Sequence, residues 1–261
     1  MKRRINNLLD GAKGDISVYC QVLDEYAPRY CHNAGFIMSS ASTIKAPIML
    51  AALELVAAGK LFLDKYIEVC ELTGDSAVFE TPRKASVLEL LTWMIIDSDN
   101  TATNALIDLA GFDFINRYIQ YDLEMTDTFL RRKMLDFESR AAGKDNMTTA
   151  CDMFKCYKRL FDGDILTDSL CGVATWILRK QRDKKRLMRF IWEDVIIAHK
   201  TGGLDYLSHD CGVFSICGHQ IYVGVFIQNA PDIDGDPRLI GQIGRIVFDE
   251  FEKSRISTIL I

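Results

Sequence analysis

The chain has 261 residues, of which 49% are hydrophobic and 26% charged. This is ordinary for a globular protein with room for one large domain or two interlocked ones. The net charge of −5 gives no electrostatic case for binding nucleic acid or an anionic membrane. No apolar run reaches the roughly 18 residues of a membrane span, so we expect none.

Other bulk features exclude few further functions. The basic start of the chain lacks the apolar segment of a signal peptide, so the chain as given reads as cytoplasmic, or as exported if a leader has been removed. Eight cysteines include no C-x-x-C pair, which favours free thiols. The four histidines show no ligand spacing, so neither a metal nor a cofactor is expected. The basic run 179–189 is interpreted as a solvated helix face.

Hydrophobic periodicity predicts the elements in chain order. A short helix over residues 2–10 precedes strands over 15–23 and 29–37, and a helix begins at Ser42 and ends at Gly59. Between residues 60 and 190 the pattern is helical, with one strand-like stretch at 66–71. The helices predicted there cover 87–96, 101–109, 112–120, 149–161 and 169–182. Strands return at 194–199, 211–217 and 220–228, before an amphipathic helix over 239–253.

Two strands at the start and three at the end predict an α+β fold, in which an antiparallel five-stranded sheet is built from both termini and flanked by helices. Residues 1–40 and 191–261 would form the sheet domain. Residues 41–190 would form an inserted, all-helical domain.

One short motif organises the chemistry. Ser42-Thr43-Ile44-Lys45 places a serine and a lysine three residues apart, on one face of a helix. A serine hydroxyl becomes a good nucleophile when a base lies within hydrogen-bond reach, and a lysine can be that base if burial lowers its pKa. Taken alone, the motif is a weak signal and is more often an ordinary helix start with a solvated lysine.

Two further motifs favour a catalytic role for Ser42 and Lys45 over an ordinary helix start. Ser98-Asp99-Asn100 follows an apolar run, and Lys200-Thr201-Gly202 follows a strand pattern. S-x-x-K, S-D-N and K-T-G in this order are the signature of class A β-lactamases and penicillin-binding proteins. The chain therefore resembles the penicillin-recognising serine hydrolases, and most closely the class A β-lactamases, over essentially its whole length. The resemblance implies the same α+β layout and closes the sheet, which periodicity alone does not.

The resemblance implies a role for each motif residue. Ser42 is the nucleophile, and its N–H with that of Gly203 forms the oxyanion hole. Lys45 activates Ser42 or carries its proton, and Ser98 relays a proton toward the leaving nitrogen with the help of the Lys200 charge.

Substrate-binding roles follow in the same way. Asn100 donates to a substrate amide carbonyl and holds Lys45, Thr201 binds a substrate carboxylate beside Lys200, and Gly202 lets the substrate approach the strand. Without the resemblance, residues 98–100 also read as a helix N-cap cluster, and Asp99 is expected to be structural. His199 should face away from Lys200 and be packed.

The deacylation base is where the pattern departs from the family. Class A enzymes carry an E-x-x-x-N pair on a loop after S-D-N, and counting back from Asn146 by the family's interval lands on Lys133. Glu138 and Asp136 are the nearby acids. The residue four positions after Glu138 is Ala142, where the family pattern has an asparagine. Glu138 could serve as the base on a rebuilt loop, or it could pair with a neighbouring arginine.

The resulting prediction is a monomeric, class A β-lactamase-like serine hydrolase, which is acylated on Ser42 by a β-lactam or a related acyl or peptide substrate and then hydrolysed. A D-Ala-D-Ala peptidase or esterase, and a penicillin-binding sensor that does not turn over, remain open alternatives. A fold kept only for protein binding is disfavoured by the intact motif set.

Overall fold

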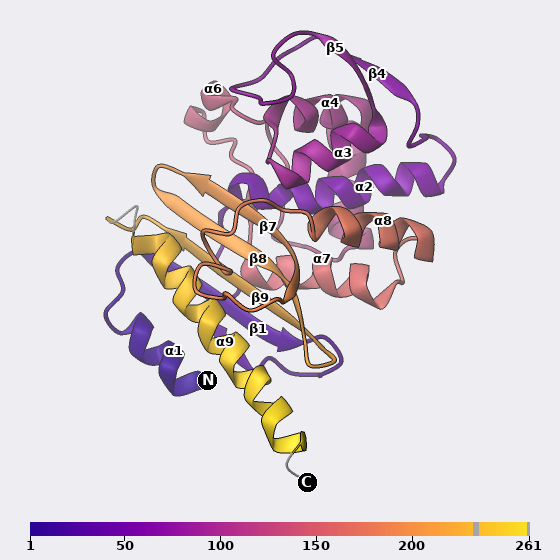
Figure 1. The fold of residues 1–261 in the computed structure, drawn as a ribbon. Coiled ribbons are helices and arrows are strands. Elements are labelled where there is room, and N and C mark those ends of the chain that lie inside the picture. The colour runs from indigo at the N-terminus through magenta and orange to yellow at the C-terminus, as the bar shows by residue number, and fades with distance from the viewer. Residues whose placement is uncertain (232–234, 260–261) are drawn as a thin grey trace.

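The computed structural model of the chain describes residues 1–231 and 235–259. At its centre lies a five-stranded antiparallel sheet with the order β2-β1-β9-β8-β7 (Figure 1). Its strands are β1 (Asp15–Val22), β2 (Tyr30–His32), β7 (Ile196–Leu204), β8 (Leu207–Ile216) and β9 (His219–Gln228). The predicted α+β fold, with a sheet built from both ends of the chain, is confirmed.

Helices cover both faces of this sheet. α1 (Lys2–Leu9) and α9 (Gly235–Ile259) lie together on one face (Figure 1). The remaining helices are α2 (Lys45–Ala57), α3 (Val87–Ile96), α4 (Asn100–Ala110), α5 (Phe112–Arg117), α6 (Phe137–Ala141), α7 (Ala150–Asp162) and α8 (Asp168–Leu178). α7 packs against β1 and β9 on the other face, which joins the sheet to the larger apolar core of the helical region.

Local sequence signals set the helix boundaries near the site. The side chain of Ser86 and that of Glu89 form a reciprocal capping box at the start of α3. Asp99 accepts a hydrogen bond from the Ala102 N–H and so caps α4. α4 therefore begins at Asn100, directly after the two polar residues that precede it.

The inserted region is not all-helical, which corrects the prediction. β4 (Tyr66–Val69) pairs with β5 (Arg83–Ser86), and the two-residue β6 (Met147–Thr148) pairs with β3 (Met38–Ser39). The Arg-Lys-Ala-Ser sequence of β5 has too little apolar alternation to predict a strand, and two residues are too few for any period. The division at residues 40 and 190 stays a prediction.

Three strand predictions had the wrong bounds. The strand expected over 211–217 begins earlier, at Leu207, and ends at Ile216. The strand expected over 29–37 ends at His32, because Asn33 adopts a left-handed φ of 48° in a turn closed by the Phe36 N–H on its carbonyl. The strand expected over 194–199 continues through Lys200-Thr201-Gly202 to Leu204. None of the helices within the described ranges is long and apolar enough to cross a bilayer.

Candidate active site

Ser42 lies in a short 3₁₀ turn, η1 (Ala41–Ile44), that leads directly into α2. The residue before it, Ala41, has a φ of 43°, which is costly for a residue with a Cβ. Ser98 (φ 58°) and Leu135 (φ 58°) share this left-handed conformation. All three residues line the cavities around Ser42, so backbone strain is concentrated at this place.

Lys45 is fully buried at the first position of α2, and its ammonium group has three acceptors. Its Nζ lies 2.6 Å from the Ser98 carbonyl oxygen, 3.1 Å from Ser98 Oγ and 2.8 Å from Asn100 Oδ1. Burial, followed by the positive charge of Lys200, holds the pKa of Lys45 well below its usual range. A lysine whose pKa is lowered in this way is a better proton acceptor than an exposed lysine.

Ser98 connects the two lysines. Its Oγ lies 3.1 Å from Lys45 Nζ and also 3.1 Å from Lys200 Nζ. Lys200 is fully buried on β7, and burial lowers its pKa to about 7 although the nearby Asp210 carboxylate opposes the shift. A hydroxyl between two such lysines can pass a proton in either direction.

Steric constraints explain why the K-T-G motif ends in a glycine, Gly202. A Cβ on Gly202 would lie 3.2 Å from the backbone nitrogen of Ser42 and 3.2 Å from side-chain atoms of Ala41 and Thr43. β7 thus passes directly against η1, and only glycine permits this approach without displacement. The contact brings the strand edge at Gly203 to the reactive serine.

Asp99 and Asn100 have different functions despite being neighbours. Asp99 caps α4 and also accepts a hydrogen bond from the hydroxyl of Ser76, which fastens the loop after β4. Asn100 accepts from Lys45. The structure therefore places Asp99 in a structural role, as expected, and Asn100 beside the reactive groups.

The sequence analysis missed the contacts of Arg186, and it gave no partner for the packed His199. Arg186 packs against Gly203, where a Cβ would lie 2.7 Å from Arg186 Nη2, and its guanidinium also contacts Ser208 (2.8 Å) and Asp183. His199 is buried and forms a 2.9 Å contact with Asp210. No short motif marks these residues, because their partners lie far away in the sequence or on another strand.

Asparagine side chains fix the loop that follows β-bridge residue Phe129. Asn146 Oδ1 accepts from the N–H groups of Arg131 (2.7 Å) and Arg132 (3.0 Å), and its amide donates to the Arg132 carbonyl. Asn104 binds both the N–H (2.8 Å) and the carbonyl (3.2 Å) of Met134. Two hydrogen bonds to one residue hold the Met134 backbone in one orientation.

A buried ion pair closes the same loop. Arg132 Nη2 lies 2.7 Å from Asp145 Oδ1, and Asp145 also accepts a hydrogen bond from Ser39. The segment between Arg132 and Asp145 is thereby tied at both ends, next to β3.

The loop presents apolar side chains to Ser42, not carboxylates. A pocket of about 80 Å³ adjoins Ser42, and no Asp or Glu of the described chain lines it. Its lining residues are Ala41, Ser42, Asn100, Arg132, Met134, Leu135, Phe137, Asn146, Gly203 and Leu204. Glu138 is exposed on α6 outside this lining, and Asp136 caps α6 through the Ser139 N–H. Neither acid lines the Ser42 pocket, and Glu138 as the base stays a prediction.

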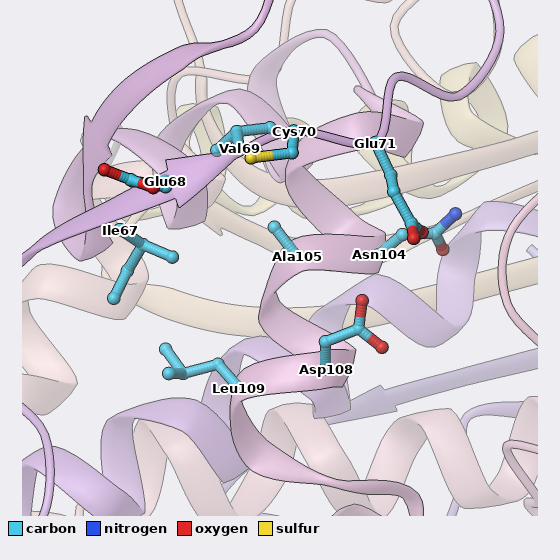
Figure 2. A pocket seen from close by; sticks show the side chains of 9 residues that line it. All are labelled: Ile67, Glu68, Val69, Cys70, Glu71, Asn104, Ala105, Asp108 and Leu109. Atoms are coloured by element: carbon cyan, nitrogen blue, oxygen red, sulfur yellow. The ribbon is translucent and has the colours of Figure 1, made fainter.

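A second cavity, of about 330 Å³, lies between β4 and α4 (Figure 2). The carboxylates of Glu68, Glu71 and Asp108 surround it, and Lys133 pairs with the last two. Asn104 lines this cavity and also binds the Met134 backbone, so the cavity adjoins the loop that contains Met134. Within residues 1–231 and 235–259, no cluster of side chains is arranged to hold a metal ion.

Known proteins resemble this chain over nearly its whole length. A model described as "Beta-lactamase enzyme family" matches residues 1–251. A β-lactamase of Bacteroides uniformis is 22% identical over 95% of this chain and 90% of its own length. The crystal structure of a β-lactamase from Sphaerobacter thermophilus DSM 20745 is 27% identical, with a TM-score of 0.86, over 94% of this chain and 95% of its own. A representative of class A β-lactamase from Bacteroides cellulosilyticus DSM 14838 is 22% identical, with a TM-score of 0.88, and 96% of each chain is covered.

Proposed function

This chain belongs to the beta-lactamase enzyme family, and on that premise we propose that Ser42 is the nucleophile of its acyl-transfer reaction. The protein is a serine β-lactamase-like hydrolase. One observation carries the residue assignment: Ser98 Oγ lies 3.1 Å from each of two buried lysines, and one of these follows Ser42 by one helical turn.

Acylation proceeds from this geometry. Ser42 Oγ attacks the carbonyl carbon of a lactam, ester or amide, and its proton passes to neutral Lys45. The carbonyl oxygen becomes an oxyanion facing the N–H groups of Ser42 and Gly203, each of which contributes about 3 kcal/mol in comparable sites. The proton then reaches the leaving nitrogen through Ser98, the C–N bond breaks, and an ester on Ser42 remains.

Cationic and polar groups hold the substrate during this step. Lys200 and Thr201 bind a carboxylate on the leaving-group side, with Arg186 behind Gly203 adding positive charge. Asn100 donates to an amide carbonyl on the acyl side. A small-molecule β-lactam, or a peptide with a C-terminal carboxylate, has both features.

Deacylation is the slow step in this proposal. Hydrolysis of the Ser42 ester needs a base to activate water, and Met134 and Leu135 occupy the loop wall of the Ser42 pocket. With an apolar wall and an exposed Glu138, the acyl-enzyme persists. This favours a penicillin-binding or slowly hydrolysing enzyme over a fast β-lactamase.

Labelling with a fluorescent penicillin tests the nucleophile. The wild-type protein should carry the label after denaturation, on the peptide that contains Ser42. Ser42→Ala should lose it with an unchanged melting temperature, and Ser139→Ala, which changes a half-buried serine of α6 outside the Ser42 pocket, should keep it. Label retained at the same peptide in Ser42→Ala would refute the assignment.

A further inference from the structure

We propose that Lys184 and Lys185 form an anion subsite on the leaving-group side of the cleft. This subsite would favour acyl substrates whose leaving group carries a second negative charge, beyond the carboxylate held by Lys200 and Thr201. The inference rests on the proposed acylation of Ser42 and names a substrate class for that reaction.

The cavity that contains these lysines adjoins the reaction centre. It has a volume of about 540 Å³, and Ser98 and Thr201 form part of its wall. Its other lining residues are Ile96, Asp97, Gln181, Arg182, Asp183, Lys184 and Lys185. Since Ser98 delivers the proton to the departing atom and Thr201 faces the leaving-group carboxylate, this cavity receives the leaving group. The pocket lined by Asn100 and Met134 receives the acyl group.

The charges in this cavity do not cancel. Arg182 pairs with Asp97 (2.6 Å), and Asp183 pairs with Arg186, so both carboxylates of the lining already have a cation. Lys184 and Lys185 are exposed, and neither has an ion-pair partner in the part of the chain that the structure describes. Two uncompensated positive charges thus face a cavity at the reaction centre of a protein whose net charge is −5.

The fold holds these lysines in place, which corrects the interpretation of residues 179–189 as a helix face. α8 ends at Leu178, and the segment after it is irregular but fastened to the end of α3. Gln181 donates to the Ile95 carbonyl (2.7 Å), and the Arg182 N–H donates to the Ile96 carbonyl (3.2 Å). The basic segment is therefore anchored two residues from Ser98.

The size of the expected effect follows from exposure. An exposed charge pair contributes from a fraction of 1 kcal/mol to about 1 kcal/mol, which corresponds to about a 1.4- to 5-fold change in rate for each lysine. Removing both charges should therefore change selectivity by about 2- to 25-fold. Salt should weaken the effect, because the charges are exposed.

The test compares two acyl thioesters that share one acyl group. One has mercaptoacetate as leaving group, with one carboxylate, and the other mercaptosuccinate, with two. In each reaction the Ser42 Oγ–carbon bond forms, the carbon–sulfur bond breaks, and the Ser42 proton goes to the departing sulfur. Acylation is followed by rapid quenching and intact mass, because free cysteines would react with a thiol reagent.

The measured quantity is the ratio of the second-order acylation constants for the dianionic and monoanionic leaving groups. Lys184→Gln/Lys185→Gln should lower this ratio by about 2- to 25-fold, with little change for the monoanionic substrate. Lys180→Gln is the matched control, because Lys180 belongs to the same basic segment but packs on Trp176 outside the cavity. Its ratio should equal that of the wild type.

The outcomes separate the two claims. Acylation of Ser42 by both thioesters with the same ratio in wild type and double variant overturns the subsite alone. An equal loss in the Lys180→Gln control also overturns it, since a general charge effect would then suffice. Failure of both thioesters and of penicillin to acylate Ser42 overturns the proposed function, and the subsite with it.

Discussion

At the scale of single residues, the proposed acylation depends on two buried lysines that need opposite charge states. Lys45 must be neutral to take the proton of Ser42, whereas Lys200 must be charged to bind a carboxylate. Both pKa values are lowered by burial, and Lys45 is further lowered by Lys200. A single hydroxyl, that of Ser98, contacts both. The pH range of activity is therefore set by this pair.

The first prediction concerns this pH range. Because the pKa of Lys200 is about 7 in the unliganded protein, raising the pH through that value removes a positive charge. The second-order acylation constant of a carboxylate-bearing β-lactam should fall as the pH rises above about 7, and that of the matching methyl ester should not. Stopped-flow acylation at pH 6 to 9 measures both. Identical profiles for acid and ester would show that Lys200 does not bind the carboxylate.

The second prediction concerns the loop residue Met134. Asn104 fixes its backbone beside the Ser42 pocket, so a carboxylate at this position would be held near the acyl-enzyme ester. Met134→Glu should accelerate deacylation by about 10-fold or more, toward the range of general-base catalysis. Decay of the penicilloyl adduct by intact mass measures the rate.

Met134→Gln is the control, because glutamine is polar and has nearly the same size as glutamate but has no carboxylate to act as a base. It should leave the adduct as long-lived as in the wild type. Equal deacylation rates for the Glu and Gln variants would show that this loop position does not determine turnover.

At the scale of elements, the site is made by β7 lying against η1. The two elements approach closely because Gly202 has no side chain. A Cβ at this position would lie only 3.2 Å from the Ser42 nitrogen. The β7–β8 hairpin is itself paired along its length, from Ile196 to Leu204. The strand is therefore the rigid partner, and the 3₁₀ turn carries the strained residue Ala41.

Gly202→Ala tests this arrangement. The added methyl group must push η1 away by a few tenths of an ångström, which displaces the Ser42 N–H of the oxyanion hole. Acylation should fall by about 10-fold or more, measured as the rate of penicillin adduct formation, while the circular dichroism spectrum is kept. Gly172→Ala, on α8 with open space around it, should acylate normally. Unimpaired acylation of Gly202→Ala would mean that the contact does not position the nucleophile.

Much of this could be predicted from the sequence, for a physical reason. The helix predicted over 87–96 has the observed bounds of α3, because its apolar residues are consecutive in the sequence and the pattern is local. The placing of Ser42, Lys45, Ser98 and Lys200 came from motifs whose spacing the chemistry itself requires. Contacts that depend on distant segments, such as Arg186 on Gly203 and Asn104 on Met134, leave no local pattern.

The loop that contains Met134 also shows what the sequence alone could not predict. Counting along the sequence from Asn146 pointed to Lys133, and proximity in sequence pointed to Glu138. The structure places Met134 and Leu135 against the pocket, because Asn104 and the Arg132–Asp145 pair fix where each residue of the loop lies. Irregular backbone has no period, so a count cannot replace these contacts.

At the scale of the whole molecule, the sheet holds buried polar groups that link pH to stability. His209 on β8 is fully buried, with Nε2 2.8 Å from the Ser39 carbonyl and Nδ1 accepting from the Ile227 N–H. Burial lowers the pKa of His209 to about 4. The folded protein therefore keeps this imidazole neutral where the unfolded chain binds a proton.

This lowered pKa determines the direction in which the free energy of unfolding changes with pH. The unfolded histidine has a pKa near 6.5, so between about pH 6.5 and pH 4 the unfolded state gains a proton that the folded state does not. The free energy of unfolding should fall by up to about 1.4 kcal/mol per pH unit in this range from His209 alone. Urea unfolding at pH 7 and pH 5 measures it. His209→Gln should flatten the dependence, and an unchanged slope in that variant would assign the effect to other groups.

In the proposed reaction, Ser42 forms an acyl-enzyme that is long-lived because Met134 occupies the loop wall of the pocket. The most direct test is the intact mass of the protein over time, after a brief reaction with penicillin and removal of the excess. The account predicts one adduct, on Ser42, that decays slowly and decays faster in Met134→Glu. An adduct that disappears within milliseconds in the wild type, or no adduct at all, would contradict it.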